Sequence, residues 1–350
     1  MNEEWPHLLQ RLGLADPGDG QQLDAPLPGD GLCSLAPLAL LSVAGEDAET
    51  VLQSQVTGDM RALADGQAQP VAHCSPKGRT LASFLALRAG DRLLLQLPEA
   101  LADGIARRLQ MFVLRARARV TRADASYLRL GLWGPAASGQ VESLVGSAPA
   151  APFQYLVADG GIALRLPGAV PRFELLLPAE SAERAAKLAG GPSTPAPFAA
   201  WRLLDIRAGL PWVHAETAEA FIPQMLNLDR LGGISFTKGC YVGQEVVARL
   251  HYLGQVKRRT HLGTALLEGP APAPGTPLFS PASTSRQGAG TVLDAVRLAD
   301  GSCELLVVVE SGAQAGQELH LGAEAGPAVQ LRPPPYALAD PEAKPARNPG

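Results

Sequence analysis

The sequence has little of several features that would assign a protein to a class at once. It contains four cysteines in 350 residues, and no pair has the Cys-x-x-Cys spacing of a zinc site or a redox dithiol. Aromatic residues make up only 5% of the chain, so we expect cores built mainly from Leu, Val and Ala. A disulfide-stapled secreted scaffold is therefore excluded, and a cytoplasmic protein with free thiols fits best.

Clusters of one charge and long apolar runs are also missing. The formal net charge is -4 and no block of Lys and Arg stands out, whereas binding to nucleic acid or anionic membranes depends on clustered cations. No stretch approaches the ~20 apolar residues that a membrane helix needs. The first residues lack the basic and apolar regions of a signal peptide. We therefore expect no direct general binding to nucleic acid and no membrane association.

The chain does contain enough apolar residues, 46%, for cores in two or three domains. Strand and helix signals alternate through the first 255 residues and predict an α+β fold, whereas short apolar runs between Gly, Pro and Ser turns follow and predict a small β-barrel. We expect five segments: a flexible N-terminal arm (1–34), a first α+β unit (35–120), a second (121–255), the barrel (256–336) and a disordered tail (337–350).

Individual elements within these segments follow from local patterns. Apolar residues three and four apart predict a helix over Glu99 to Phe112, and Trp201 to Ala208 reads as another. Val113 to Val120 alternates apolar residues with arginines and predicts a strand with one basic face.

The run Lys238-Gly239-Cys240-Tyr241-Val242-Gly243-Gln244-Glu245 is the most informative stretch. An ammonium group favours thiolate over thiol, so Lys238 would lower the pKa of Cys240 if the two side chains converged. Cys240 is therefore the first candidate for a functional residue. The alternative is a buried structural cysteine on a tight turn. Pairing of Cys240 with His251 as nucleophile and base lacks a third, orienting group.

This run, with Phe221 to Leu228 and Gly232 to Phe236 before it, closely resembles the YgfZ family of folate-binding proteins. These proteins are relatives of the T protein (aminomethyltransferase) of the glycine cleavage system. The resemblance implies two interleaved mixed α/β (ferredoxin-like) layers as in that protein, plus the C-terminal small β-barrel. It also implies tetrahydrofolate or a derivative as ligand, no resident metal, and support of assembly or maintenance of iron–sulfur enzymes. These transient client enzymes include radical enzymes that thiolate tRNA.

The same resemblance assigns roles to individual residues. Trp201 would stack on folate, Gln224 and Asn227 would read the pterin edge, and Cys240 with Lys238 would act on clients. Packing of Trp201 in a helix, ordinary loop amides, and a helix cap at Glu245 remain the alternatives for these positions. A second tryptophan of the family would fall at Leu38, which leaves one stacking contact open. The remaining predicted folate contacts are Tyr241, Gln244, Glu245, Arg79 and Arg249.

A folate-dependent aminomethyltransferase is the alternative function. Such an enzyme carries paired aspartates after the glycine that matches Gly78, and we place Leu81 and Ala82 at those positions. Neither side chain can move a proton or stabilise a cationic intermediate, so we predict that this activity is absent. A third possibility is a docking scaffold that has lost folate. The leading hypothesis requires the Cys240 thiol and a pterin cavity beside Trp201 to share one opening.

Overall fold

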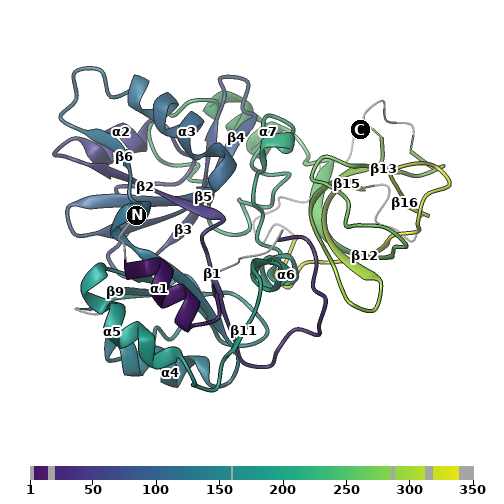
Figure 1. The fold of residues 1–350 in the computed structure, drawn as a ribbon. Helices are drawn as coiled ribbons and strands as arrows, with labels where there is room; N and C mark the ends of the chain where they lie inside the picture. The colour runs from purple at the N-terminus through teal and green to yellow at the C-terminus, as the bar shows by residue number, and fades with distance from the viewer. Residues whose placement is uncertain are drawn as a thin grey trace.

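The computed structural model describes residues 4–14, 20–158, 161–283, 285, 288–311 and 318–338. Three sheets organise them: two sheets stacked face to face and a third that curls into a half-barrel at one side (Figure 1). Within the described residues, no helix is long and apolar enough to cross a membrane.

The first sheet is antiparallel, in the order β3-β4-β5-β2-β6. Helices α2 (Ala48–Gln53) and α3 (Glu99–Met111) cover its outer face (Figure 1). The predicted helix over Glu99 to Phe112 is thus confirmed. The strands are β2 (Leu38–Ala44), β3 (Gln69–Cys74), β4 (Thr80–Ala89), β5 (Arg92–Pro98) and β6 (Arg119–Arg122).

The second sheet has the order β11-β1-β7-β10-β9-β8. Its outer face packs on α1 (Glu4–Arg11), α4 (Ala137–Val145) and α5 (Ala182–Ala185) (Figure 1). Because β1 precedes the whole first sheet in the chain, the two layers interleave. The strands are β1 (Gly31–Ser34), β7 (Leu128–Trp133), β8 (Tyr155–Ala158), β9 (Gly161–Leu166), β10 (Arg172–Leu177) and β11 (Thr194–Pro195).

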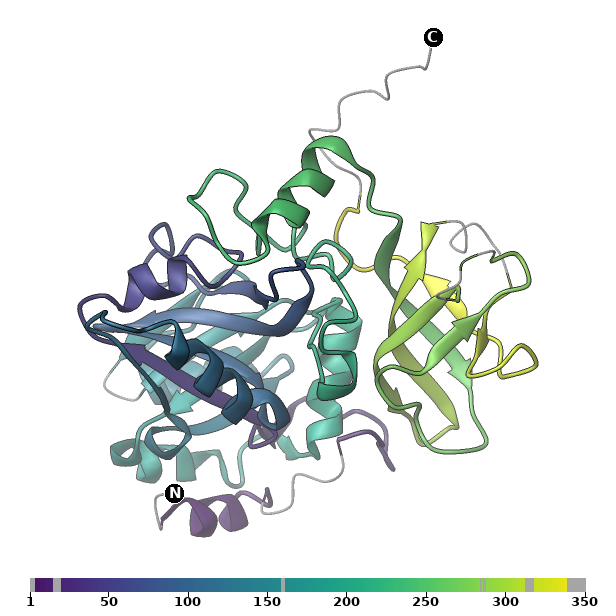
Figure 2. The ribbon, with the colours of Figure 1, turned by 90° about the horizontal axis from the view of Figure 1, so that it is seen from above.

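The third sheet is antiparallel and curls into the half-barrel seen at the right of Figures 1 and 2. Helix α6 (Phe198–Ala208) lies between this sheet and the stacked layers, and α7 (Gln244–Leu253) leads into it. The strands are β12 (Arg258–Leu266), β13 (Pro277–Phe279), β14 (Gly290–Arg297), β15 (Ser302–Glu310), β16 (His320–Leu321) and β17 (Gln330–Arg332). The fold class predicted from the sequence is confirmed.

Two local predictions differ from the structure. The described part of residues 1–34 is packed, because Trp5 and Leu8 of α1 are buried and β1 pairs with both β7 and β11. The predicted strand over Val113 to Val120 is wrong: the chain turns after α3, with Leu114 at a φ of 46°, and only β6 is extended. Of the predicted tail, residues 339–350 lie outside the described part.

The largest core cluster joins all three sheets. It takes apolar side chains from the facing sides of the first and second sheets, from α6, and from β14 and β15 of the barrel. Ion pairs bridge the same junction: Arg202 of α6 holds Asp294 of β14 in a buried pair, and Arg207, which is exposed, holds Glu304 of β15 at 2.6 Å. The three sheets therefore form one body, and cavities at their junction are framed by rigid elements.

Candidate functional site

The loop that carries the Lys-Gly-Cys motif lies across the turns at one end of the first sheet. Its backbone is held at two points, where Ser235 N donates to Thr57 O at 2.9 Å and Val242 N donates to Ser54 O at 3.2 Å. Between these points the chain reaches solvent at Gly239 and Cys240, which are both exposed. The loop is thus fixed at its ends and free at its tip.

Two glycines allow this loop to approach the turn between β3 and β4. Gly243 has a φ of +83°, and a Cβ there would lie 2.6 Å from Ser75 O and 2.9 Å from Gly78 Cα. Gly78 has a φ of +69°, and its Cβ would lie 2.7 Å from Val246 Cβ. Only glycine combines this backbone conformation with this proximity. Gly243 is therefore needed so that the backbone of the motif loop can contact the backbone of the turn at 75–78.

Lys238 lies beneath the loop rather than beside the thiol. Its Nζ donates to Val56 O at 2.8 Å and to Gly58 O at 2.6 Å, and the side chain is buried. Burial lowers the pKa of Lys238 to about 8. The predicted activation of Cys240 requires the Lys238 ammonium to point toward the thiol. The ammonium instead points into the protein, where it ties the loop to the backbone of residues 56–58.

Cys240 is the exposed cysteine of the chain, whereas Cys33, Cys74 and Cys303 are buried. Burial also raises the pKa of Cys74 to about 12, so that thiol stays protonated. Tyr241, next to Cys240, points inward: the Lys238 Nζ lies 5.0 Å from its ring centre and its hydroxyl is buried. Of the motif side chains around the loop tip, the Cys240 thiol alone is presented to a partner.

The predicted amide ligands are engaged in structural hydrogen bonds. Gln224 is buried and its Nε2 donates to Val247 O of α7 at 2.7 Å. Asn227 is buried at a φ of 57°, and its Nδ2 donates to Thr260 O of β12 at 2.9 Å. Both amides join the loop at 221–228 to the elements that follow it.

The remaining predicted folate contacts lie on or near the surface. Arg79 donates from Nη1 to Ala220 O at 2.7 Å. Gln244 begins α7 half-buried, while Glu245 and Arg249 of the same helix are exposed. None of these residues lines the cleft described next.

A cleft of about 210 Å³ opens between the first sheet, helix α6 and strand β14 of the third sheet. Trp212 and Phe198 supply aromatic walls, and Leu38 supplies an aliphatic one, at the position where the resemblance places a tryptophan. Sequence reasoning did not select Trp212, although it follows the helix of Trp201 closely. The other lining residues are Gly20, Pro37, Pro98, Glu99, Ala100, Arg202, His214 and Asp294.

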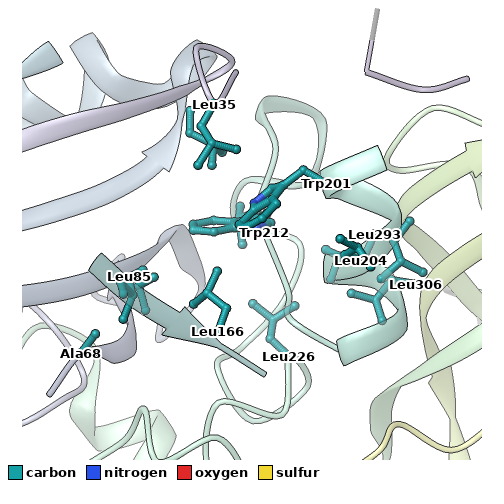
Figure 3. Close-up of a cluster of buried hydrophobic side chains, with 14 of the residues drawn as sticks. Leu35, Ala68, Leu85, Leu166, Trp201, Leu204, Trp212, Leu226, Leu293 and Leu306 are labelled. Carbon is teal, nitrogen blue, oxygen red and sulfur yellow. The ribbon is translucent and has the colours of Figure 1, made fainter. Parts of the chain in front are cut away.

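Trp201 lies in the core against the second sheet and does not line this cleft. It is completely buried, beside Trp133, and Arg172 lies 5.1 Å from its ring centre. Figure 3 shows Trp201 and Trp212 together at the centre of the core between the stacked sheets and α6. The indole Nε1 of Trp201 has no hydrogen-bond partner among the described residues, and a buried donor without a partner is a feature that calls for an explanation.

A second unpartnered polar group lies in the same layer. Glu174 of β10 is completely buried, and its Oε2 accepts a hydrogen bond from Gln96 Nε2 of β5 at 3.0 Å. Its Oε1 has no partner in the described part of the chain. Burial raises the pKa of Glu174 to about 7. The sequence signal for this residue is a lone acid within the apolar strand Arg172–Leu177.

Gln96, the hydrogen-bond partner of Glu174, lies on a strand that borders the cleft. Leu38 pairs with Pro98, and Leu40 pairs with Gln96, in the β2–β5 ladder. Because side chains two residues apart on a strand share a face, Gln96 lies one step inward from Pro98, which lines the cleft. Gln96 thus connects the Glu174 carboxylate to β5, the strand whose last residue, Pro98, lines the cleft.

The positions compared with the transferase aspartates face elsewhere. Leu81 and Ala82 pack against the core on the outer side of the first sheet. The β4 residues that line the inner side are Ser83 and Leu85, at an enclosed cavity of about 20 Å³ behind Trp212. Our assignment of the facing residues was wrong, and the residues that do face inward also lack a carboxylate.

The thiol and the cleft do not share one opening. No residue from 238 to 245 lines the cleft, and the cleft residues come from other segments. His251, which we weighed as a base for Cys240, instead stacks on Phe236 with ring centres 3.7 Å apart. In the described residues no group of His, Cys, Asp and Glu side chains is placed to hold a metal ion.

Comparison with known proteins gives relatives over most of the chain. The chain is 34% identical over 301 residues to the tRNA-modifying protein YgfZ of Edwardsiella ictaluri, covering 85% of this chain and 89% of that protein. It is 33% identical over 313 residues to the protein of the same name from Enterobacter sp. (strain 638), covering 88% and 94%. No protein-family model matches.

Among solved structures, the chain resembles the glycine cleavage system aminomethyltransferase T from Bartonella henselae. The TM-score is 0.65 at 16% sequence identity, and the likeness covers 93% of this chain and 87% of the other. At this identity the likeness concerns the fold alone.

We predict that Gly243→Ala destabilises the protein by about 2 kcal/mol, because alanine is strained at this φ and its Cβ meets the 75–78 turn. Gly239→Ala is the matched control in the same loop. Nothing lies within 4 Å of a Cβ built there, so the change should stay within about 0.5 kcal/mol. Urea unfolding measures both, and equal effects would contradict the packing described here.

We also predict an unusual dependence of stability on pH from Glu174. The pKa of Glu174 is raised to about 7 in the folded protein. Its contribution to the free energy of unfolding is therefore fully present below the ordinary glutamate pKa and is lost as the pH rises through 7. Glu174→Gln stays neutral, and should raise the free energy of unfolding at pH 8 by about 2 kcal/mol. At pH 5 the difference should shrink. A variant that is less stable than the parent at pH 8 would refute the assignment.

Proposed function

This chain belongs to the YgfZ family, and we propose that it binds tetrahydrofolate or a derivative in the Trp212 cleft and supports iron–sulfur enzymes through Cys240. The clients include radical enzymes that thiolate tRNA, which agrees with the name of the relatives, tRNA-modifying protein. The observation that carries the proposal is the placement of the cysteines: three are buried, and Cys240 is exposed at the tip of an anchored loop.

The residues at the junction fit a folate. Its flat pterin needs an apolar slot with an aromatic wall and a few convergent polar groups. Trp212, Phe198 and Leu38 supply the walls. The unpartnered Oε1 of Glu174 supplies an acceptor for the amino and amide edge of the pterin, and the Nε1 of Trp201 supplies a donor. When bound, folate supplies a carrier for one-carbon units.

Access to Glu174 requires movement of the side chains that cover it. A pterin that enters the cleft meets Leu38 and Pro98, and Gln96, which holds Glu174, is two residues from Pro98 on the same face of β5. Trp201 then serves as a donor from the floor of the site, and Trp212 replaces it as the stacking ring. Gln224 and Asn227 have a structural role, because their hydrogen bonds fix the loop at 221–228 to α7 and β12.

The same geometry argues against aminomethyl transfer as the main activity. The inner face of β4 presents Ser83 and Leu85 to the junction, and neither side chain can take up a proton at neutral pH or stabilise a developing cation. Ser83 is moreover engaged, since its Oγ donates to Pro211 O and accepts from Val213 N. Glu174 binds the ligand's edge rather than replacing a carboxylate on β4.

Cys240 acts on a protein partner rather than on the folate. Because the thiol lies outside the cleft, contact with sulfur or iron takes place at the surface of the client. Lys238 positions the loop through its two carbonyl bonds, and its role is to hold the loop so that the thiol faces solvent. Folate in the cleft and the thiol on the loop are linked through the first sheet, which borders both.

Isothermal titration with tetrahydrofolate tests the ligand. The parent protein should bind, and Glu174→Gln should bind at least about tenfold more weakly, because a charge-assisted hydrogen bond to the pterin edge is lost. Glu99→Gln is the control in the wall of the cleft, where Glu99 already pairs with Arg122 at 2.6 Å. A parent that does not bind overturns the folate proposal, and equal binding by the Glu174 variant overturns that residue's role.

Cys240→Ser tests the thiol separately. In cells that depend on this protein, the variant should bind folate like the parent yet lose most of the support for iron–sulfur enzymes, measured as thiolated nucleosides in tRNA. Cys303→Ser, in a buried strand of the barrel, serves as the control for loss of any thiol. Full client activity with Cys240→Ser would show that the thiol is not used.

A further inference from the structure

Helix α7, which follows the motif loop, is almost unburied. Val247 is its only buried residue, whereas Val246, Tyr252 and Leu253 are 39%, 63% and 83% exposed. A ten-residue helix is not stable through its own propensity, and this one is held by the Gln224 bond to Val247 O and by its contact with Gly78. Figure 2 shows α7 at the outer edge of the molecule, away from the sheets.

The aromatic side chains on this helix are nevertheless fixed. His251 stacks on Phe236 with ring centres 3.7 Å apart and planes 10° apart. Tyr252 meets both rings edge-on, at 4.8 Å from His251 and 6.3 Å from Phe236, and its hydroxyl donates to Phe236 O at 3.4 Å. Rings that are already ordered lose little side-chain entropy when a partner covers them.

This surface, here called the α7 face, lies on both sides of the thiol along the chain. It consists of Phe236, Val246, Arg249, His251, Tyr252 and Leu253. Phe236 comes just before the motif and Val246 just after it, so the tip with Cys240 lies between them along the chain. Val246 also contacts the Gly78 turn on which the loop rests.

The charges around the α7 face are mainly positive. Lys77, Arg249 and Lys257 are exposed, and none has an ion pair in the part of the chain that the structure describes. Glu245 is the acidic residue of the helix itself. A partner that covers this surface is therefore expected to carry acidic residues around an apolar patch.

We propose that the α7 face is the docking surface for the protein client, an iron–sulfur enzyme with an acidic-rimmed apolar patch, and that docking presents its cluster region to Cys240. The inference rests on the proposed function and names where the partner binds. The mixture of aliphatic side chains, ordered aromatic rings and an arginine is typical of protein interfaces. Nucleic acid would use the rings for stacking, but it has no use for exposed Leu253 and Val246.

Leu253→Glu tests the docking surface, because it places a carboxylate on the most exposed apolar residue of the α7 face without disturbing a buried contact. Leu266→Glu is the matched control, an exposed leucine (76%) on β12 of the barrel. In cells that depend on this protein, Leu253→Glu should lower thiolated nucleosides in tRNA to the level of Cys240→Ser. Leu266→Glu should leave them unchanged, and both purified variants should keep folate binding and the parent melting temperature.

Crosslinking gives a readout that does not depend on loss of function. A photoreactive phenylalanine derivative at position 253 should form an adduct with the cell's tRNA-thiolating radical enzyme, detected with an antibody to that enzyme, and the same group at position 266 should not. Absence of this adduct, together with normal thiolation by Leu253→Glu, would overturn the docking proposal.

Two other outcomes separate the remaining possibilities. If the parent protein itself fails to restore thiolation, the proposed function fails, and the docking inference falls with it. If purified protein binds unmodified tRNA transcripts and Leu253→Glu abolishes that binding, the occupant of the α7 face is RNA and the protein-docking proposal is overturned.

Discussion

One buried ammonium group holds the functional loop in place. Lys238 extends beneath the motif and donates to the carbonyl oxygens of Val56 and Gly58. Its ammonium group thus satisfies two backbone acceptors in the segment that follows α2. Burial disfavours the charged form of Lys238 and lowers its pKa. With its base tied down, and with Gly243 in contact with the 75–78 turn, the loop leaves only its tip in solvent, and the tip carries Cys240.

The core between the stacked sheets contains polar groups that lack hydrogen-bond partners among the described residues. Apolar side chains from both inner faces form the main core, yet Glu174 and Trp201 keep an unpartnered acceptor and donor within it. Each such group destabilises the fold by about 1–3 kcal/mol, and proteins keep groups of this kind where a ligand or water completes them. Both groups lie in the core between the stacked sheets, and Trp201 belongs to the helix that borders the cleft beside Trp212.

The separation of thiol and cleft changes how the two are connected. A sulfur inside the cleft could reach a ligand bound there, whereas the exposed sulfur of Cys240 is accessible only to molecules that approach the loop from solvent. The first sheet connects the two features: β2 and β5 border the cleft, and the turn between β3 and β4 supports the loop. Ligand binding that moves Leu38 or Pro98 thus acts on the same sheet that carries the thiol.

The family and the fold class were predictable from the sequence, because the motif, the periodicities and the turn residues are local in the chain. The helix at Glu99 and the barrel strands were predictable for the same reason. The roles of Lys238, Gln224 and Asn227 were not, since an ammonium or an amide takes whichever acceptor the fold brings within reach, and here those are backbone carbonyls of other segments. The placement of three other residues also depends on tertiary structure: Glu174, Trp212 and the inward-facing Ser83. Strand pairing and sheet packing determine their burial and facing direction, and both depend on residues far away in the sequence.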